Sequence, residues 1–342
     1  MKIKKYLCLA AASLMLLAGC NNSPSPAPVD NNDGDDSNPA VELQKITFVL
    51  DWSPNTNHTG LYVADALGFY EDAGIEIEIV QPPEDGAVAL VGSGMAQFGV
   101  GFQDTIAPAY TSSAPVPVTN VAAIINHNTS GIISAAEKGI DSFKKLEGHT
   151  YATWDSPVEQ NVIRAAMEAD GGDFDKLELV STYVTDVMAA LQTDMIDSVW
   201  VYEGWDVAKA KVDGVVYNYL DFAKTNPVLD YYSPTIIAND DFLAENPDLA
   251  RAFLAATAKG YEYCVTNPVE AGEILCEAVP ELDSALVQES MKFLSTAYIG
   301  DGEAWGYIDD ARWSGFYNWL YANGLIEKEL GSFGYTNEYL PK

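Results

Sequence analysis

The sequence predicts an α/β protein built from two lobes. An alternation of strand and helix patterns runs once between residues 45 and 130 and starts again between residues 131 and 234. Strands are indicated by β-branched runs or by period-two alternation, as in Ile75–Val80 (IEIEIV). Because helices separate these strands, the sheets should be largely parallel with helices on both faces. A mostly helical segment follows from residue 235 to the end.

The individual elements follow from the same patterns. In the first run, strands are expected at 45–50, 75–80, 98–102 and 118–125, with helices at 59–67, near 85–93 and from about 103. In the second run, strands at 149–154, 177–183 and 196–202 alternate with helices at 157–169, 186–193 and 203–211. After a strand candidate at 235–238, helices are expected at 241–243, 247–266, 268–278, 283–295 and 309–323.

The first 20 residues have the pattern of a secretory signal peptide. Three lysines precede an apolar run at 6–18, which is too short to span a membrane, and small residues follow it. The ending Leu-Ala-Gly-Cys resembles a bacterial lipobox, in which Cys20 carries two acyl chains, enough for durable anchoring. An ordinary signal with an unmodified Cys20 is the alternative. Residues 21–44, rich in Asn, Ser, Pro and Asp, are expected to be a disordered tether.

Composition and charge limit the partners. The remaining length is enough for two ordinary domains with sizeable cores. The chain has 50 acidic and 18 basic residues, a net charge of −32, so it is not expected to bind nucleic acid. Outside the signal peptide and Cys20, the cysteines are Cys264 and Cys276, which have no metal-site spacing. We expect two buried thiols, with a disulfide through a turn at 267–268 left open.

Ligands of open parallel sheets bind beyond the carboxyl ends of the strands. Four polar or aromatic loops are expected at such ends: 51–58, 103–105, 155–157 and 202–206. Trp52 offers a face for ring stacking and Asn55 can hydrogen-bond a heterocycle edge, although the polar residues around them could instead cap the next helix. The candidate ligand-binding residues are Trp52, Asn55, His58, Tyr62, Gln103, Asp104, Asp155, Tyr202, Glu203, Trp205 and Asp206.

Asp155-Ser-Pro opens a predicted helix, whose free N–H groups could bind an anion or a carbonyl. The charge of Asp155 opposes an anion there, which disfavours a phosphorylated ligand. A simple helix cap is the equal alternative.

Several segments together resemble the NMT1/THI5-like family of substrate-binding proteins. They are WSPNTNHTGLYVA at 52–64, GFY at 68–70, GIEIE at 74–78, GSG at 92–94, FGVG at 98–101, LEG at 146–148, NP at 246–247 and YTNEYL at 335–340. The resemblance covers nearly all of residues 45–342. It implies a type II periplasmic-binding-protein fold, with one lobe from 45–130 and 235–342, the other from 131–234, and hinges near 128–134 and 222–234.

The resemblance also implies a function. Similar members are lipid-anchored receptors of ABC importers, and the branch most like this chain captures pyrimidine precursors of thiamine. We therefore expect a monomeric receptor without a cofactor that binds a small heterocycle and docks on a membrane permease. A flavin is the alternative ligand.

The segment VWVYEGWD at 199–206 carries the family's second cluster. The family has a tyrosine with a carboxylate four residues later, and Tyr202 and Asp206 match it, with Asp in place of the more usual Glu. Glu203 is another candidate. A carboxylate suits an aminopyrimidine because it accepts paired hydrogen bonds. In the alternative reading, Trp205 is a core residue and the two acids only favour a helix start.

Catalytic motifs are sparse. The three histidines lie far apart in sequence, and no G-x-S-x-G, Walker or His-Glu-x-x-His motif occurs. Related fungal enzymes synthesise the pyrimidine and carry a cysteine-rich run, whereas the matching stretch here, 226–234, has no cysteine. We therefore expect a binding protein, with the synthase as the alternative class.

Overall fold

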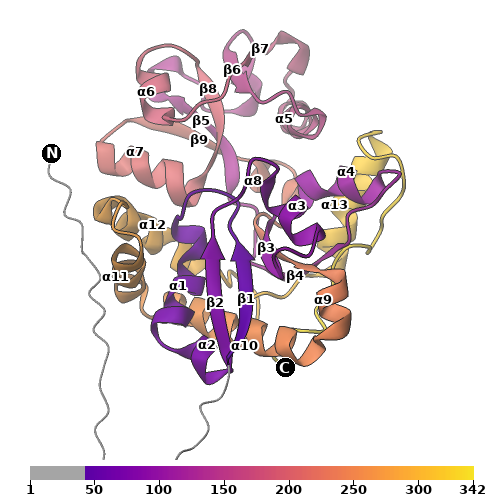
Figure 1. Cartoon of the computed structure of the whole chain (residues 1–342). Helices are drawn as coiled ribbons and strands as arrows, with labels where there is room; N and C mark the ends of the chain where they lie inside the picture. The colour runs from indigo at the N-terminus through magenta and orange to yellow at the C-terminus, as the bar shows by residue number, and fades with distance from the viewer. Residues whose placement is uncertain (1–42) are drawn as a thin grey trace, which may run out of the picture. The chain divides into compact units, whose positions relative to one another are not determined.

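Two five-stranded sheets organise residues 43–342, the part of the chain that the computed structural model describes (Figure 1). The predicted signal peptide and the lipidation of Cys20 lie outside these residues, as does nearly all of the predicted tether. The described residues form one compact unit. None of their helices is long and apolar enough to cross a membrane.

The first sheet has the strand order β2-β1-β3-β10-β4. Its strands are β1 (Gln44–Val49), β2 (Ile75–Val80), β3 (Phe98–Gly101), β4 (Val118–Ala123) and β10 (Thr235–Asn239). β1 pairs in parallel with β2 and β3, whereas β10 is antiparallel to β3 and β4. The alternating sequence IEIEIV therefore forms an edge strand, as its half-polar pattern suggests.

The second sheet has the order β7-β6-β8-β5-β9. Its strands are β5 (Ser130–Ala135), β6 (Thr150–Thr153), β7 (Glu178–Ser181), β8 (Ser198–Tyr202) and β9 (Tyr217–Asp221). β6 is parallel to β7 and β8, and β5 is antiparallel to β8 and β9. Both sheets are thus mixed. The expectation of largely parallel sheets holds except for one antiparallel strand in each sheet. The reversed strands, β5 and β10, are the ones that follow the two passages between the sheets.

Helices fill the connections between strands. They are α1 (Thr59–Ala66), α2 (Phe69–Asp72), α3 (Gly86–Gly92), α4 (Gln103–Thr111), α5 (Pro157–Ala169), α6 (Val187–Gln192), α7 (Ala208–Asp213), α8 (Phe222–Thr225), α9 (Asp240–Glu245), α10 (Pro247–Thr266), α11 (Pro268–Ala278), α12 (Ser284–Ala297) and α13 (Asp310–Ala322). The bounds of α5, α10 and α11 are as predicted, because proline marks the first turn of each. The helix predicted at 203–211 is instead a π-helical turn, η5 (Glu203–Val207), followed by α7.

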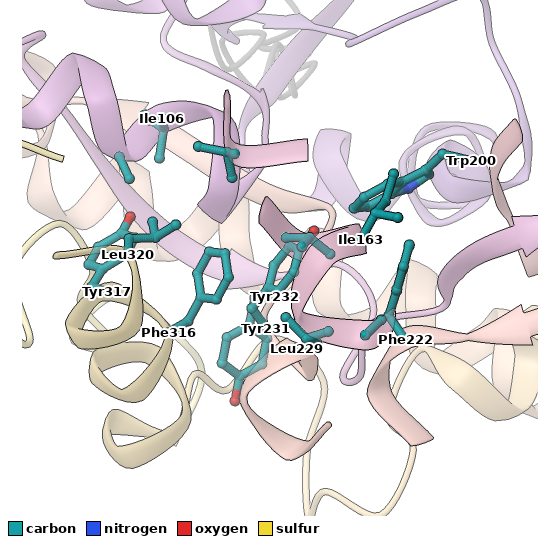
Figure 2. Close-up of a cluster of buried hydrophobic side chains, with 14 of the residues drawn as sticks. Ile106, Ile163, Trp200, Phe222, Leu229, Tyr231, Tyr232, Phe316, Tyr317 and Leu320 are labelled. Atoms are coloured by element: carbon teal, nitrogen blue, oxygen red, sulfur yellow. The ribbon is translucent and has the colours of Figure 1, made fainter. Parts of the chain in front are cut away.

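The second passage between the sheets, residues 222–234, is packed into a hydrophobic core. Figure 2 shows side chains of this passage between those of α13 and those of α5 and β8. Tyr231 stacks on Phe316 of α13 with ring centroids 4.0 Å apart, and Phe222 lies 4.3 Å from Trp200 of β8. The passage is therefore fixed by aromatic contacts on both sides. Cys264 and Cys276 are both free thiols, the first buried and the second half-buried.

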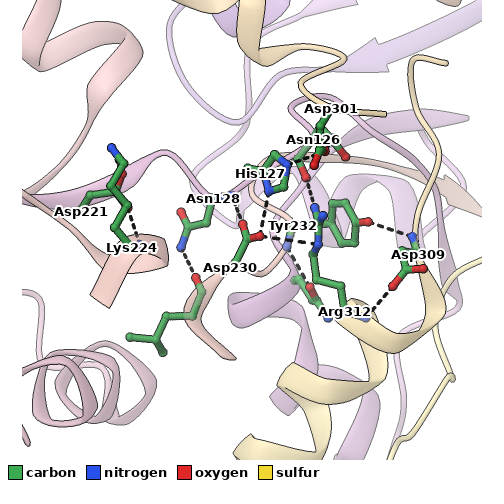
Figure 3. Close-up of polar contacts among 12 residues, drawn as sticks. Asn126, His127, Asn128, Asp221, Lys224, Asp230, Tyr232, Asp301, Asp309 and Arg312 are labelled. Carbon is green, nitrogen blue, oxygen red and sulfur yellow. Dashed lines mark hydrogen bonds and ion pairs between the residues drawn. The ribbon is translucent and has the colours of Figure 1, made fainter. Parts of the chain in front are cut away.

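A polar network joins the two passages between the sheets (Figure 3). His127 of the first passage lies between two carboxylates, with Nδ1 2.7 Å from Asp230 Oδ2 and Nε2 2.8 Å from Asp301 Oδ1. Carboxylates only accept hydrogen bonds, so both contacts are satisfied when both ring nitrogens carry protons. The hydrogen bond to Asp230 is the main cause that raises the pKa of His127, while burial and the nearby Arg312 oppose it.

This network predicts a stability that depends on pH. A histidine whose pKa is raised by folding stabilises the protein fully below its unfolded pKa, about 6.5, and this contribution is lost as pH rises through the folded pKa. Because Asp301 is largely exposed, we expect only about 1 kcal/mol. Urea denaturation from pH 6 to 9 should show wild type more stable than His127→Gln at the acid end and equal to it at the alkaline end. Parallel curves would show that the imidazolium adds nothing.

Candidate functional site

A cavity of about 360 Å³ lies where loops at the strand ends of the two sheets meet. The first sheet supplies residues that follow β1 and β3, and the second supplies residues that follow β7 and β8, as the strand-end rule predicts. Its walls are Asp51, Trp52, Asn55, Asn57, Phe102, Tyr183, Val184, Thr185, Val187, Trp200, Tyr202, Trp205 and Asp206. Hollows of about 510 and 450 Å³ lie elsewhere, but neither contains a tryptophan.

Aromatic pairs span the cavity from one sheet to the other. The rings of Trp52 and Tyr183 have centroids 6.0 Å apart at an interplanar angle of 50°, and those of Phe102 and Tyr202 lie 6.3 Å apart at 41°. Trp52 and Tyr183 are 54% and 67% exposed, so both rings have faces that a ligand can reach. An exposed aromatic pair at a cavity offers faces on which a flat ligand can stack.

The cavity walls contain carboxylates and no lysine or arginine. Asp206 accepts a hydrogen bond from the backbone N–H of Tyr202 at 3.3 Å. Burial raises the pKa of Asp206 to about 6, although hydrogen bonds from the backbone N–H groups of Tyr202 and of Asp206 itself lower it. The carboxylate therefore has no cationic partner among the wall residues, so a ligand that donates hydrogen bonds would stabilise it.

A buried serine holds the two sides of the cavity together. Ser290 of α12 lies 2.5 Å from the hydroxyl of Thr56, in the loop after β1, and its own hydroxyl donates to the carbonyl of Gly204 in η5. The loop and the π-helical turn that carry the site are thus tied through one side chain. Neither contact has a signal in the local sequence.

Five of the predicted residues line the cavity: Trp52, Asn55, Tyr202, Trp205 and Asp206. Asn55 also caps the short helix η1 (Thr56–His58), because its side chain accepts from the N–H of Asn57 at 2.9 Å. Asn55 is therefore both a helix cap and a wall residue of the cavity, and its contact with a ligand stays a prediction.

Other predicted residues lie outside the cavity walls. His58 is fully buried, with Nε2 2.7 Å from Asp51. Gln103 is also fully buried and donates to the carbonyl of Trp313 at 2.8 Å. Tyr62 and Glu203 are half-buried on α1 and η5.

Asp104 and Asp155 also lie outside the walls. Asp104 accepts from Tyr231 at 3.4 Å, and burial raises its pKa to about 6. Asp155 accepts from the Ser181 hydroxyl at 2.8 Å. At the helix start after Asp155, Glu159 accepts from the N–H of Ser156 in a capping box, as the helix-cap alternative predicts.

Sequence reasoning missed several wall residues. Asp51 stands directly before Trp52 at the end of β1, and Tyr183 stands in the loop after β7, so the strand-end rule could have included both. Phe102 and Trp200 belong to apolar runs and give no local sign of facing a cavity. The remaining missed wall residues are Asn57, Val184, Thr185 and Val187.

Comparison with solved structures defines the class of fold. The chain is similar to the alkanesulfonate-binding protein SsuA of Xanthomonas axonopodis pv. citri, with a TM-score of 0.66 and 12% identity, over 86% of this chain and 99% of that one. SsuA has the type II periplasmic-binding-protein fold, and the two mixed sheets described above have the same arrangement. The expected fold class is thereby confirmed.

The family follows from sequence comparison. Residues 55–271 match the family model described as NMT1/THI5 like, and the chain belongs to this family. A formylaminopyrimidine-binding protein of Halalkalibacterium halodurans is 28% identical over 96% of this chain and 97% of its own. A 4-amino-5-hydroxymethyl-2-methylpyrimidine phosphate synthase of Legionella pneumophila is 26% identical over 77% of this chain and 84% of its own. The family thus contains both binding proteins and synthases.

Proposed function

We propose that the protein is the extracytoplasmic substrate-binding component of an ABC importer and that it captures an aminopyrimidine precursor of thiamine. The observation that carries the proposal is a cavity with aromatic walls from both sheets and with carboxylates but no basic side chain. The similarity to a formylaminopyrimidine-binding protein over nearly the whole chain supports the same ligand class. Lipidation at Cys20, followed by a tether, would hold the receptor at the membrane.

The chemistry of the cavity fits a flat, uncharged heterocycle. The pyrimidine ring would stack on Trp52, and its amino group would donate to Asp206, whose other contacts come from the backbone. A phosphate group would meet these carboxylates without a cation to balance it. The free pyrimidine therefore suits the site better than its phosphate ester.

Binding would be coupled to closure of the two sheets on the ligand. The cavity draws its walls from both sides, so a ligand that contacts both walls favours the arrangement in which they are close. A permease could then distinguish the closed, loaded receptor from the empty one.

A flavin is the second candidate, because six of the wall residues are aromatic and could stack a larger ring system. The synthase reading is disfavoured by the absence of cysteine from 226–234. These alternatives differ in what the protein binds and in whether it forms a product.

Calorimetric titration tests the proposal directly. We expect a formylaminopyrimidine and a hydroxymethylpyrimidine both to bind, and the hydroxymethyl compound to bind at least about tenfold more tightly than its phosphate ester, a difference of about 1.4 kcal/mol. Mass spectrometry of small molecules released from natively purified protein should find the same class. Tight binding of riboflavin with no binding of pyrimidines would show that the ligand is a flavin and not a pyrimidine. Formation of a pyrimidine product after incubation with metal ions and a pyridoxal cofactor would show that the protein is an enzyme and not a receptor.

A further inference from the structure

We propose that Asp51, held by the buried His58, is a second ligand-anchoring carboxylate, and that with Asp206 it restricts the site to ligands with hydrogen-bond donors on two sides and no negative charge. This inference rests on the proposed function and names the feature of the site that selects its ligand. It assigns a role to Asp51, which lies directly before Trp52, and changes the expected role of His58 from ligand contact to positioning.

Asp51 lines the cavity but is tied to the protein through one oxygen. Its Oδ1 lies 2.7 Å from Nε2 of His58, and its side chain is 17% exposed. Among the hydrogen bonds within residues 43–342, this contact of Oδ1 involves Asp51, and none involves its Oδ2. One oxygen of the carboxylate is thus fixed, and the other remains available to a ligand in the cavity.

The tautomer of His58 is set by its second nitrogen. Nδ1 lies 3.1 Å from the backbone N of Asn55 and accepts a hydrogen bond from its N–H, so Nδ1 itself carries no proton. The ring proton is therefore on Nε2, where it is donated to Asp51. Because the His58 side chain is fully buried, water does not compete with Asp51 for the hydrogen bond from Nε2. The geometry makes His58 a neutral donor that orients a carboxylate.

The two carboxylates come from opposite sides of the cavity. Asp51 follows β1 of the first sheet, and Asp206 belongs to η5, directly after β8 of the second. Both act on Tyr202, whose pKa is raised mainly by burial and further by the charges of Asp104, Asp51 and Asp206. The ligand space between them is therefore a region of negative potential.

This arrangement gives selectivity by both attraction and rejection. A ligand with donors on two sides can satisfy both carboxylates and so joins the two sheets. An anion, or a ligand that presents only acceptors, would be repelled by the two carboxylates and would leave their free oxygens without donors, which costs more than the loss of an ordinary contact. The same two residues thus select the ligand and link its recognition to closure.

The test compares three ligands that share one ring and differ in charge. They are 4-amino-5-aminomethyl-2-methylpyrimidine, which is cationic, the neutral 5-hydroxymethyl compound and its anionic phosphate. Wild-type affinity should fall in that order. In Asp51→Asn, the ratio of cation to anion affinity should fall about tenfold or more. Asp248→Asn, which removes the same charge from a fully exposed position outside the cavity walls, should leave the ratio unchanged.

His58 variants test the positioning role. His58→Gln keeps a neutral side-chain donor and should retain most of the wild-type ratio, whereas His58→Ala should approach Asp51→Asn. If His58→Ala does not fold, the ratio of cation to anion affinity in Asp51→Asn still tests whether Asp51 anchors the ligand. A wild-type ratio preserved in Asp51→Asn would overturn this inference and leave the proposed function standing. A wild-type protein that binds none of the three ligands would overturn the proposed function and this inference together.

Discussion

Gly260→Ala is expected to lower the free energy of unfolding by about 3 kcal/mol or more, because the added methyl group has no room. A Cβ atom built on Gly260 lies 2.0 Å from the carbonyl oxygen of Gly60, well inside contact distance. These residues belong to α10 and α1, which pack against each other beside β1 (Figure 1). The obstacle is backbone, so relief requires the two helices to move apart.

Gly315→Ala is the matched control for this prediction. Gly315 lies inside α13 with nothing within 4 Å of its added Cβ. Alanine there should stabilise the protein by about 0.5–1 kcal/mol, since it restricts the unfolded chain and favours the helix. Urea denaturation of both variants measures the difference. Equal stabilities for the two variants would mean that α1 and α10 are not in backbone contact.

The contact between Gly60 and Gly260 lies close to the site in sequence, so the substitution should also affect ligand binding. Gly60 stands two residues after His58, at the start of α1, so a displaced α1 would disturb the loop that carries Asp51 and Trp52. A residue with no contact to the cavity would then affect binding through the position of a helix. The residual folded fraction of Gly260→Ala should bind ligand more weakly than wild type.

The fold was predictable where local chemistry and tertiary position agree. Proline at the first turn placed α5, α10 and α11, and alternation placed β2 at Ile75–Val80. The strand β5 was predicted only as part of a hinge at 128–134, because its residues SGIISA carry a glycine and two serines among few apolar residues. It forms a strand because β8 and β9 pair with it on both sides.

The site was predictable from strand ends but not from residue type alone. Asp51, Tyr183 and Asp206 occupy loops or turns that the strand-end rule identifies. Which polar side chains face the cavity depends on hydrogen-bond partners that the local sequence does not reveal. The side-chain amide of Gln103, for example, donates to the backbone carbonyl of Trp313, which is far away in sequence. By contrast, Ser156-Pro-Val-Glu159 is a capping-box pattern visible in the sequence, and it accounts for the helix start that had suggested an anion site.

Trp52→Ala is expected to weaken ligand binding by about 1–3 kcal/mol, or roughly ten- to a hundredfold, because it removes a stacking face. It also removes the contact with Tyr183 that spans the two sheets, where the ring centroids are 6.0 Å apart. A ligand held by one wall only dissociates faster, so most of the loss should be in the dissociation rate. Folding should be unaffected, since Trp52 is 54% exposed and its removal leaves no core cavity.

Two further variants serve as controls for this prediction. Trp52→Phe keeps an aromatic face and should recover part of the affinity, which a loss caused by local misfolding would not. Tyr307→Ala removes an aromatic side chain of similar exposure, 57%, that lies outside the cavity walls, and should bind like wild type. Calorimetry and stopped-flow dissociation with the same pyrimidine measure all three. If wild type binds and Trp52→Ala matches Tyr307→Ala, the ligand does not lie between Trp52 and Tyr183, and another hollow must hold it.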